Sequence, residues 1–189
     1  MTAPAADNAA IAPVSDARFE PRAFRNALGQ FPTGVCVVTA QAPDGEDLGM
    51  TMSSFNSLSL DPPLILFSID RRALSLSQWK QAKGYAVNFL AESQKHISDK
   101  FARSLSDKWS GVVFDRGEAK APLLRGATAQ LECSRHTVYE VGDHVLFIAR
   151  VKRFRSFADR MPLIFCNGKY GSLRSTDELL PFWPLAVHY

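Results

Sequence analysis

The sequence has few of the residues and motifs on which metal, nucleotide and membrane sites usually depend. Its three cysteines have no CxxC spacing and its four histidines no metal-ligand spacing, so a structural zinc site is not indicated. No GxGxxG follows a predicted strand and no Walker loop is present, which argues against a Rossmann or P-loop nucleotide site. No apolar run approaches the roughly 18 residues of a membrane span, and no signal-peptide pattern opens the chain. The odd number of cysteines, in apolar runs, predicts reduced thiols and a cytoplasmic protein.

The charge is also modest. The net charge is +3 and no run of basic residues is interleaved with exposed aromatics, so nucleic-acid binding is not expected. A small anionic ligand is compatible with this charge. With 189 residues, 46% of them hydrophobic, the chain is long enough to bury one sizeable core without disulfides.

The two ends of the chain differ in composition. Residues 1–17 are rich in alanine and proline and predict a loose arm, or alternatively an arm that drapes over a partner subunit. Residues 18–189 are predicted to form one domain. The C-terminal run LLPFWPLAVHY is aromatic and is expected to dock on a surface or on a second subunit.

The stretch 49–69, GMTMSSFNSLSLDPPLILFSI, organises the middle of the chain. A continuous strand through its first half would place Thr51, Ser53, Ser57 and Ser59 on one face. Hydroxyl groups taken out of water need hydrogen-bond partners, since each unpaired one costs about 1 to 3 kcal/mol. A polar ligand would supply the partners, and an edge strand facing water is the alternative.

The remaining patterns predict strands at short spacing with few helices. Helices are expected at 20–31, 73–82 and 92–103, and residues 104–121 read as a polar loop. Strands are expected at 35–40, from 48 onwards, and at 64–69, 85–90, 127–139, 144–154 and 163–170. Six or seven strands with two or three inserted helices favour a mainly β fold, a β-barrel decorated by helices.

Five motifs in order resemble the short-chain flavin reductases, the reductase components of two-component flavin-dependent monooxygenases in the FMN-binding split-barrel group. They are FPTGVCVVTA at 31–40, GMTMSSFNSLSLDPPLILFSI at 49–69, YAVNFLAESQ at 85–94, GDHVLFIARV at 142–151 and PLIFCNGKYGSL at 162–173. The resemblance implies a homodimer of split barrels with FMN or FAD near the subunit interface. It implies hydride transfer from NADH or NADPH to the flavin, and a separate monooxygenase as partner.

The resemblance also implies a set of flavin-binding residues. Thr51, Met52, Ser53 and Ser54 would line the flavin ring and ribityl chain, with Ser57 towards the phosphate. The phosphate would lie near a helix N-terminus expected at Leu74, with Arg72 more exposed to solvent, and its expected ligands are Ser68, Ile69, Arg71 and Ser75.

His144 is the candidate catalytic residue. It follows Gly142 and Asp143 in a turn and opens an apolar strand, so its ring can project from the rim of the barrel. By resemblance it would lie beside flavin and nicotinamide, orienting the carboxamide or stabilising charge on the reduced flavin.

Three other residues are candidates for the flavin site. Two of them, both aromatic, also have a structural interpretation. Phe101 covers the cofactor or belongs to the core, and Tyr170 stacks on a ring or closes the core. Lys169 is matched to the family's motif near the flavin edge. Two alternative functions remain open: a flavin- or haem-binding carrier or sensor without turnover, and an oxidase of the pyridoxamine-phosphate type.

Overall fold

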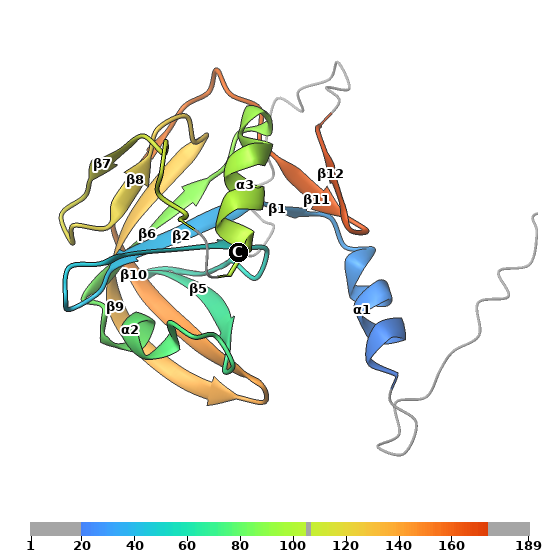
Figure 1. Ribbon diagram of the computed structural model, residues 1–189, viewed down its shortest axis with the longest axis horizontal. Helices are drawn as coiled ribbons and strands as arrows, with labels where there is room; N and C mark the ends of the chain where they lie inside the picture. Colours follow the sequence, from blue (N-terminus) through green and yellow to red (C-terminus); the bar gives the residue numbers. More distant parts are fainter. Residues whose placement is uncertain (1–19, 105–106, 174–189) are drawn as a thin grey trace, which may run out of the picture.

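A seven-stranded antiparallel sheet forms the body of the protein in a computed structural model that describes residues 20–104 and 107–173. Figure 1 shows the sheet curling around a central core. In spatial order the strands are β3 (Asp47–Met52), β2 (Cys36–Gln41), β6 (Gly84–Phe89), β9 (Ala129–Val141), β10 (His144–Ser156), β5 (Pro63–Asp70) and β4 (Asn56–Leu60). Because β3 and β4 end the order without pairing to each other, the barrel is split. The predicted split-barrel fold is confirmed.

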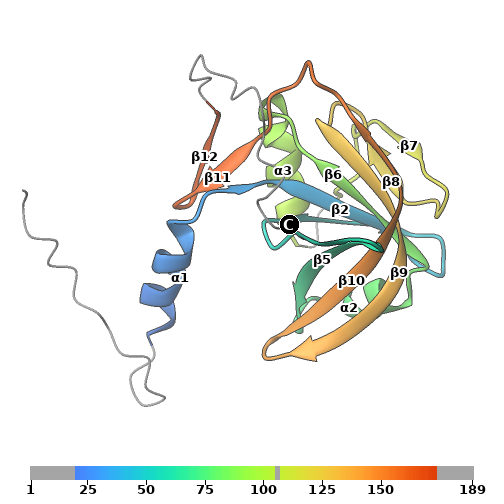
Figure 2. The same ribbon diagram turned by 180° about the vertical axis from the view of Figure 1, so that it is seen from behind.

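The predicted hairpins form where the turn signals lie. β2 pairs with β3 from Cys36 opposite Met52 to Gln41 opposite Asp47, across a turn in which Gly45 has a φ of +93°. β9 and β10 form a long hairpin around Gly142, which has a φ of +57°. Both glycines adopt a backbone conformation that side chains with a Cβ rarely accept. Figure 2 shows the β9–β10 hairpin from behind.

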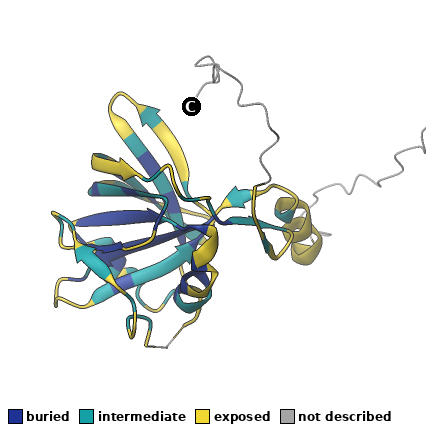
Figure 3. Cartoon of the chain, turned by 90° about the horizontal axis from the view of Figure 1, so that it is seen from above, coloured by how far each residue is buried: buried dark blue, intermediate teal, exposed yellow. Residues whose placement is uncertain are grey.

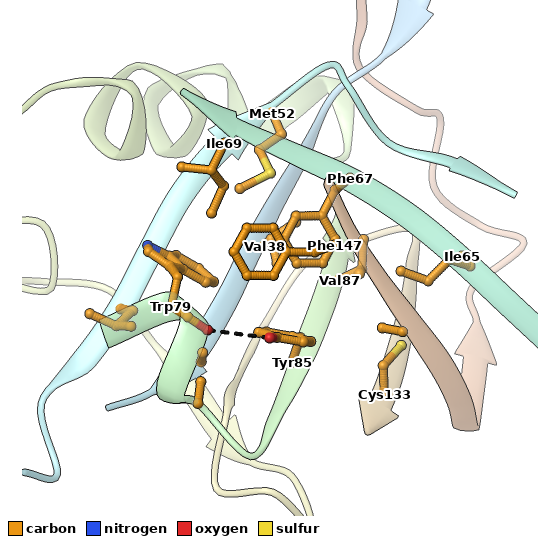
Figure 4. Close-up of a cluster of buried hydrophobic side chains, with 14 of the residues drawn as sticks. Val38, Met52, Ile65, Phe67, Ile69, Trp79, Tyr85, Val87, Cys133 and Phe147 are labelled. Carbon is orange, nitrogen blue, oxygen red and sulfur yellow. Dashed lines mark hydrogen bonds between the residues drawn. The ribbon is translucent and has the colours of Figure 1, made fainter. Parts of the chain in front are cut away.

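Aromatic side chains fill the inside of the curled sheet (Figure 4). Phe67 of β5 and Phe147 of β10 stack with ring centres 5.1 Å apart, and Tyr85 packs edge-on against both. Trp79 reaches this core from α2 (Leu76–Gln81), and its carbonyl accepts the Tyr85 hydroxyl at 3.3 Å. All four side chains are at most 1% exposed, so hydrophobic burial holds the sheet curled.

The stretch 49–69 differs from the expected continuous strand. β3 ends at Met52 and β4 begins at Asn56, with a register irregularity between Ser57 and Ser59. The single alternating hydroxyl face does not exist, because the chain bends at residues 53–55 to cross from one free edge of the sheet to the other. The strand expected at 64–69 is present as β5.

Helices are present at all three expected places and are shorter than expected. They are α1 (Pro21–Gly29), α2, and α3 (Lys95–Ala102), which follows a 3-10 turn at Glu92–Gln94. α3 lies against β3, where Gly49 allows close contact: a Cβ there would lie 2.3 Å from the Phe101 ring. The expected helix start at Leu74 is wrong, since α2 begins at Leu76 and has only six residues.

Two small sheets complete the described part of the chain. β1 (Thr33–Gly34), β11 (Ile164–Cys166) and β12 (Lys169–Gly171) form one, and with α1 they make the unit called here the α1 module. The module lies to one side of the barrel (Figure 1), and Figure 3 shows its helix largely exposed. The other small sheet pairs β7 (Phe114–Arg116) with β8 (Pro122–Leu124), so the region expected to be only a polar loop contains a strand.

Two terminal expectations, the N-terminal arm and the docked C-terminal run, lie outside the described residues. Within the described ranges, no helix is long and apolar enough to span a membrane. Cys36 and Cys133 are buried free thiols and Cys166 is partly buried and free. Burial raises the pKa of Cys36 and of Cys133 to about 12.

Candidate flavin and nicotinamide site

An open cavity of about 580 Å³ lies between β3, the end of β5 and the end of α3, and is called here the β3–α3 cavity. It is lined by Met50, Thr51, Asp70, Arg72, Ala73, Phe101, Ala102, Arg103, Ser104 and Lys108. Three basic side chains and a single carboxylate line it, so its potential favours an anionic ligand. Its volume lies in the range of ordinary small-molecule sites.

Thr51 is the predicted flavin residue that lines this cavity most directly. Its hydroxyl donates to the Ser98 carbonyl of α3 at 2.6 Å, so the proton is already used and the oxygen can only accept a further bond. The neighbouring Met52 side chain is 6% exposed and points into the core (Figure 4). The Met52 side chain is therefore not available to a ligand.

The serines that follow have different environments. The Ser54 hydroxyl donates to the Ser68 carbonyl at 3.2 Å and accepts from the Ser68 amide at 3.1 Å, which ties the 53–55 bend to β5. Ser53 and Ser57 are exposed. The hydroxyl-rich bend is thus held in place by one serine and leaves other polar groups accessible.

The expected phosphate-binding residues divide among three places. Ile69 is 1% exposed and belongs to the core (Figure 4). Arg71 turns to the β9–β10 hairpin, where its guanidinium lies 3.3 Å from the Glu140 carboxylate. Ser75 accepts the Trp79 indole N–H at 3.2 Å. The phosphate is therefore not held by a helix N-terminus at Leu74, because α2 begins at Leu76 and is too short to concentrate a helix dipole there.

Basic residues that the sequence analysis did not select replace them at the cavity. Arg72, expected to be solvated, does have an exposed side chain paired with Asp70 at 2.7 Å, and it also lines the cavity. That Arg72 hydrogen bond lowers the pKa of Asp70 well below its usual range. Arg103 is the last residue of the helix expected at 92–103, and Lys108 comes from the segment regarded as a polar loop. Counting the basic residues just after Phe101 could have revealed both.

Lys108 is the most enclosed of the three. Its ammonium donates to the Gly49 carbonyl at 3.2 Å and to the Phe101 carbonyl at 3.3 Å. Desolvation by burial lowers the pKa of Lys108. Two of its three N–H groups are used in these bonds, and the third has no protein acceptor within the described residues.

His144 stands at the rim next to this cavity. It opens β10 directly opposite Asp70 of β5, so the two side chains share one face of the sheet. Its Nδ1 lies 2.7 Å from the Asp143 carboxylate, and this hydrogen bond lowers the pKa of Asp143. With Nδ1 held by Asp143, Nε2 is the ring nitrogen free for a ligand.

Phe101, Lys169 and Tyr170 are placed differently. The Phe101 ring is 0% exposed and packs edge-on against Trp109 at 4.9 Å, a core position under the cavity. Lys169 and Tyr170 lie on β12 in the α1 module, and the Tyr170 hydroxyl contacts Ser98 at 2.9 Å and Asp99 at 2.8 Å. Neither lines the β3–α3 cavity of its own chain.

The predicted site residues therefore gather only in part. Thr51 and Phe101 meet at the cavity, with His144 at its rim. No observation tests which of them binds a flavin, and their roles remain predictions.

A smaller apolar cavity of about 290 Å³ lies beside the same bend. It is lined in part by Thr33, Gly34, Phe55 and Phe89, and the two phenylalanine rings are 4.9 Å apart. The 53–55 bend thus has an apolar aromatic wall near it as well as a polar, basic cavity. A flavin requires both kinds of surface.

Comparison with known proteins identifies the family of the chain. The family model of the flavin reductase like domain matches residues 28–174, so the chain belongs to that family. The predicted flavin reductase family is confirmed.

Individual relatives support the same assignment. The chain is 45% identical over 138 residues to the stachydrine N-demethylase reductase subunit Stc3 of Rhizobium meliloti, covering 73% of this chain and 60% of that protein. It is 40% identical to a flavin reductase of Pseudomonas putida, covering 80% of this chain and 89% of that protein. The solved NADH:FAD oxidoreductase SgcE6 of Streptomyces globisporus, with NAD and FAD fragments, superposes with a TM-score of 0.79 at 34% identity, covering 84% and 96% of the two chains.

Proposed function

We propose that this protein is an NAD(P)H-dependent flavin reductase that transfers hydride from a reduced nicotinamide to FMN or FAD. The observation that carries the proposal is the β3–α3 cavity, where a hydroxyl-bearing strand and three basic side chains meet beside His144. Relatives named flavin reductases, including an NADH-dependent FMN reductase of Agrobacterium fabrum at 37% identity, support it.

The residues present fit a flavin. The bound flavin would supply the electron-accepting chemistry, and hydride transfer needs no protein acid or base. Arg72, Arg103 and Lys108 would bind the phosphate by charge-assisted hydrogen bonds. The 53–55 bend offers polar groups for the pyrimidine edge of the ring. His144, oriented by Asp143, would place Nε2 where the nicotinamide or the flavin carries charge.

Flavin-dependent oxidation of NADH tests this proposal. Purified protein should consume NADH or NADPH under air when FMN or FAD is added, and the four combinations should be compared at steady state. If no combination is consumed, the proposal is wrong. A flavin that stays bound through dialysis but is not reduced by either nicotinamide would instead indicate a carrier or sensor.

A homodimer forms part of the proposal. α1 contains no buried residue, and Leu28 and Phe31 at its end are 58% and 77% exposed. Such an exposed apolar face suits a second copy of the chain. In a dimer, Lys169 and Tyr170 of one chain would lie near the flavin of the other, with the Tyr170 hydroxyl still bound to Ser98 and Asp99 of its own chain.

The reduced flavin would be delivered to a separate flavin-dependent monooxygenase. The proposal draws on relatives named reductase components, such as that of the trigonelline monooxygenase of Acinetobacter baylyi at 41% identity. That protein is longer, since the match covers 44% of it. The free thiols of Cys36, Cys133 and Cys166 suit the cytoplasm proposed for the reaction.

A further inference from the structure

A second cavity shares a wall with the β3–α3 cavity. It has a volume of about 470 Å³, lies between the start of β3 and α2, and is called here the β3–α2 cavity. Four residues line both cavities: Met50, Ala73, Ser104 and Lys108. The two cavities therefore adjoin at Lys108, and the second is the nearest space for a ligand too long for the first.

The shared wall suits phosphate. Lys108 is held by the carbonyls of Gly49 and Phe101, which leaves one N–H of a partly desolvated ammonium for a ligand. Because the ammonium is fixed by these two bonds, little side-chain entropy is lost when an anion binds there. Arg72 and Arg103 line only the β3–α3 cavity, and Lys108 lines both. The positive charge therefore lies in the β3–α3 cavity and at the wall that the two cavities share.

The far end of the β3–α2 cavity has the opposite character. Its carboxylates are Glu46, Asp47 and Asp107, and the Gln78 amide donates to Glu46 at 3.3 Å. Asp47 is paired with Arg116, with one contact of 2.7 Å. Carboxylates and an amide can accept hydrogen bonds from ribose hydroxyls and an adenine amino group, whereas a further phosphate there would be repelled.

We propose that the β3–α2 cavity binds the adenosine end of a dinucleotide whose diphosphate lies at Lys108. This inference rests on the proposed function, because it takes the β3–α3 cavity as the place of the flavin. FAD and NADH share this adenosine diphosphate half, so either is a source of the ligand, and NADH bound there would compete with the flavin phosphate for Lys108. The carboxylates at the far end make a 2′-phosphate unfavourable there.

Gln78→Trp tests the proposal by filling the β3–α2 cavity from α2. The matched control is Gln81→Trp, since Gln81 is exposed one turn later on the same helix and lines neither cavity. Equilibrium titrations with FMN, FAD and NADH are measured separately for both variants. In Gln78→Trp, the dissociation constant of FAD or of NADH should rise about tenfold or more, while that of FMN stays within about twofold, and Gln81→Trp should match the parent protein.

The outcomes separate the sources. Weaker FAD binding assigns the cavity to the flavin, and weaker NADH binding assigns it to the nicotinamide nucleotide. If all three constants are unchanged, or if FMN weakens as much as FAD and NADH, the proposal is overturned. Failure of the proposed function would appear elsewhere, as a parent protein that binds flavin but oxidises no NADH.

A competition experiment on the parent protein covers the case in which Gln78→Trp does not fold. ADP should displace FAD or NADH, and 2′,5′-ADP should do so about tenfold less well because of Glu46, Asp47 and Asp107. ADP that displaces neither dinucleotide, or equal competition by both nucleotides, would overturn the proposal.

Discussion

The barrel and the α1 module cover their apolar side chains in different ways. In the barrel, Phe67 and Phe147 are 0% exposed and stacked inside the sheet, so this region is complete within one chain. In the module, no residue of α1 is buried. The turn at Asn167, between β11 and β12, is tied to Gly29 of α1 by a backbone hydrogen bond of 2.8 Å. The difference shows that the barrel encloses its own core, whereas α1 leaves its apolar side chains exposed within one chain.

Removing a core ring should produce the largest effect. Phe147→Ala leaves a cavity against Phe67 and should lower the free energy of unfolding by about 3 to 5 kcal/mol. Phe154→Ala is the control on the same strand, because Phe154 is 77% exposed, and it should change stability by less than about 0.5 kcal/mol. Chemical denaturation measures both, and similar losses would contradict the burial of Phe147 in a packed core.

His144→Ala should come next, acting on the reaction and leaving the barrel intact. The rate of flavin reduction at saturating NADH should fall about tenfold to a hundredfold, because Nε2 no longer stabilises charge in the transition state. Flavin affinity should change less than this rate. Stopped-flow reduction with a parallel flavin titration measures the two effects, and an unchanged rate would remove His144 from catalysis.

Lys108→Met should weaken flavin phosphate binding. The loss of one charge-assisted hydrogen bond, worth about 1.5 to 3 kcal/mol, predicts a rise in the FMN dissociation constant of about tenfold or more. Lys108→Arg keeps a cation there and should retain more of the affinity. Riboflavin, which has no phosphate, should be affected less than FMN in the same titration, and equal effects on the two would argue against a phosphate contact.

Phe31→Glu addresses the module directly. A charge at position 31, just after α1, should shift the protein from dimer to monomer in sedimentation velocity, with little change in the unfolding of the barrel. Leu60→Glu, an equally exposed apolar position on β4, is the control. A monomeric parent protein, or a dimer unaffected by Phe31→Glu, would rule out the module as the interface.

The smallest effect concerns acid stability. Arg72 lowers the pKa of Asp70 in the folded protein, so the native state binds fewer protons there than the unfolded state. The stabilisation is present above the ordinary aspartate pKa near 3.8 and is lost as pH falls below it. Asp70→Asn should flatten the decline of stability between about pH 4 and pH 2. Denaturation curves at several pH values test this, and an unchanged slope would contradict it.

Much of the barrel was predictable because strand signals are local. Alternating apolar residues and turn glycines located the β2–β3 and β9–β10 hairpins, and the order of the motifs indicated the family. The family resemblance indicated Thr51 and His144, which lie in two of its five motifs.

Local patterns could not locate the bend at residues 53–55. Both a continuous strand and a broken one agree with the alternation of hydroxyls, and the break follows from β3 and β4 occupying opposite edges of the split sheet. Ile69 is a different case, because its alternation with Ile65 and Phe67 along β5 could have placed it in the core from the sequence alone.

The sequence by itself determined the strands, the hairpins and the chemical types of the residues that a flavin requires, because these depend on side chains close together along the chain. Only the tertiary structure decided which basic groups share a cavity. Lys108 reaches Gly49 across 59 positions of sequence, and Arg71 turns away to Glu140. Such pairings depend on the packing of α3 and of the β9–β10 hairpin against distant strands, which no short stretch of sequence specifies.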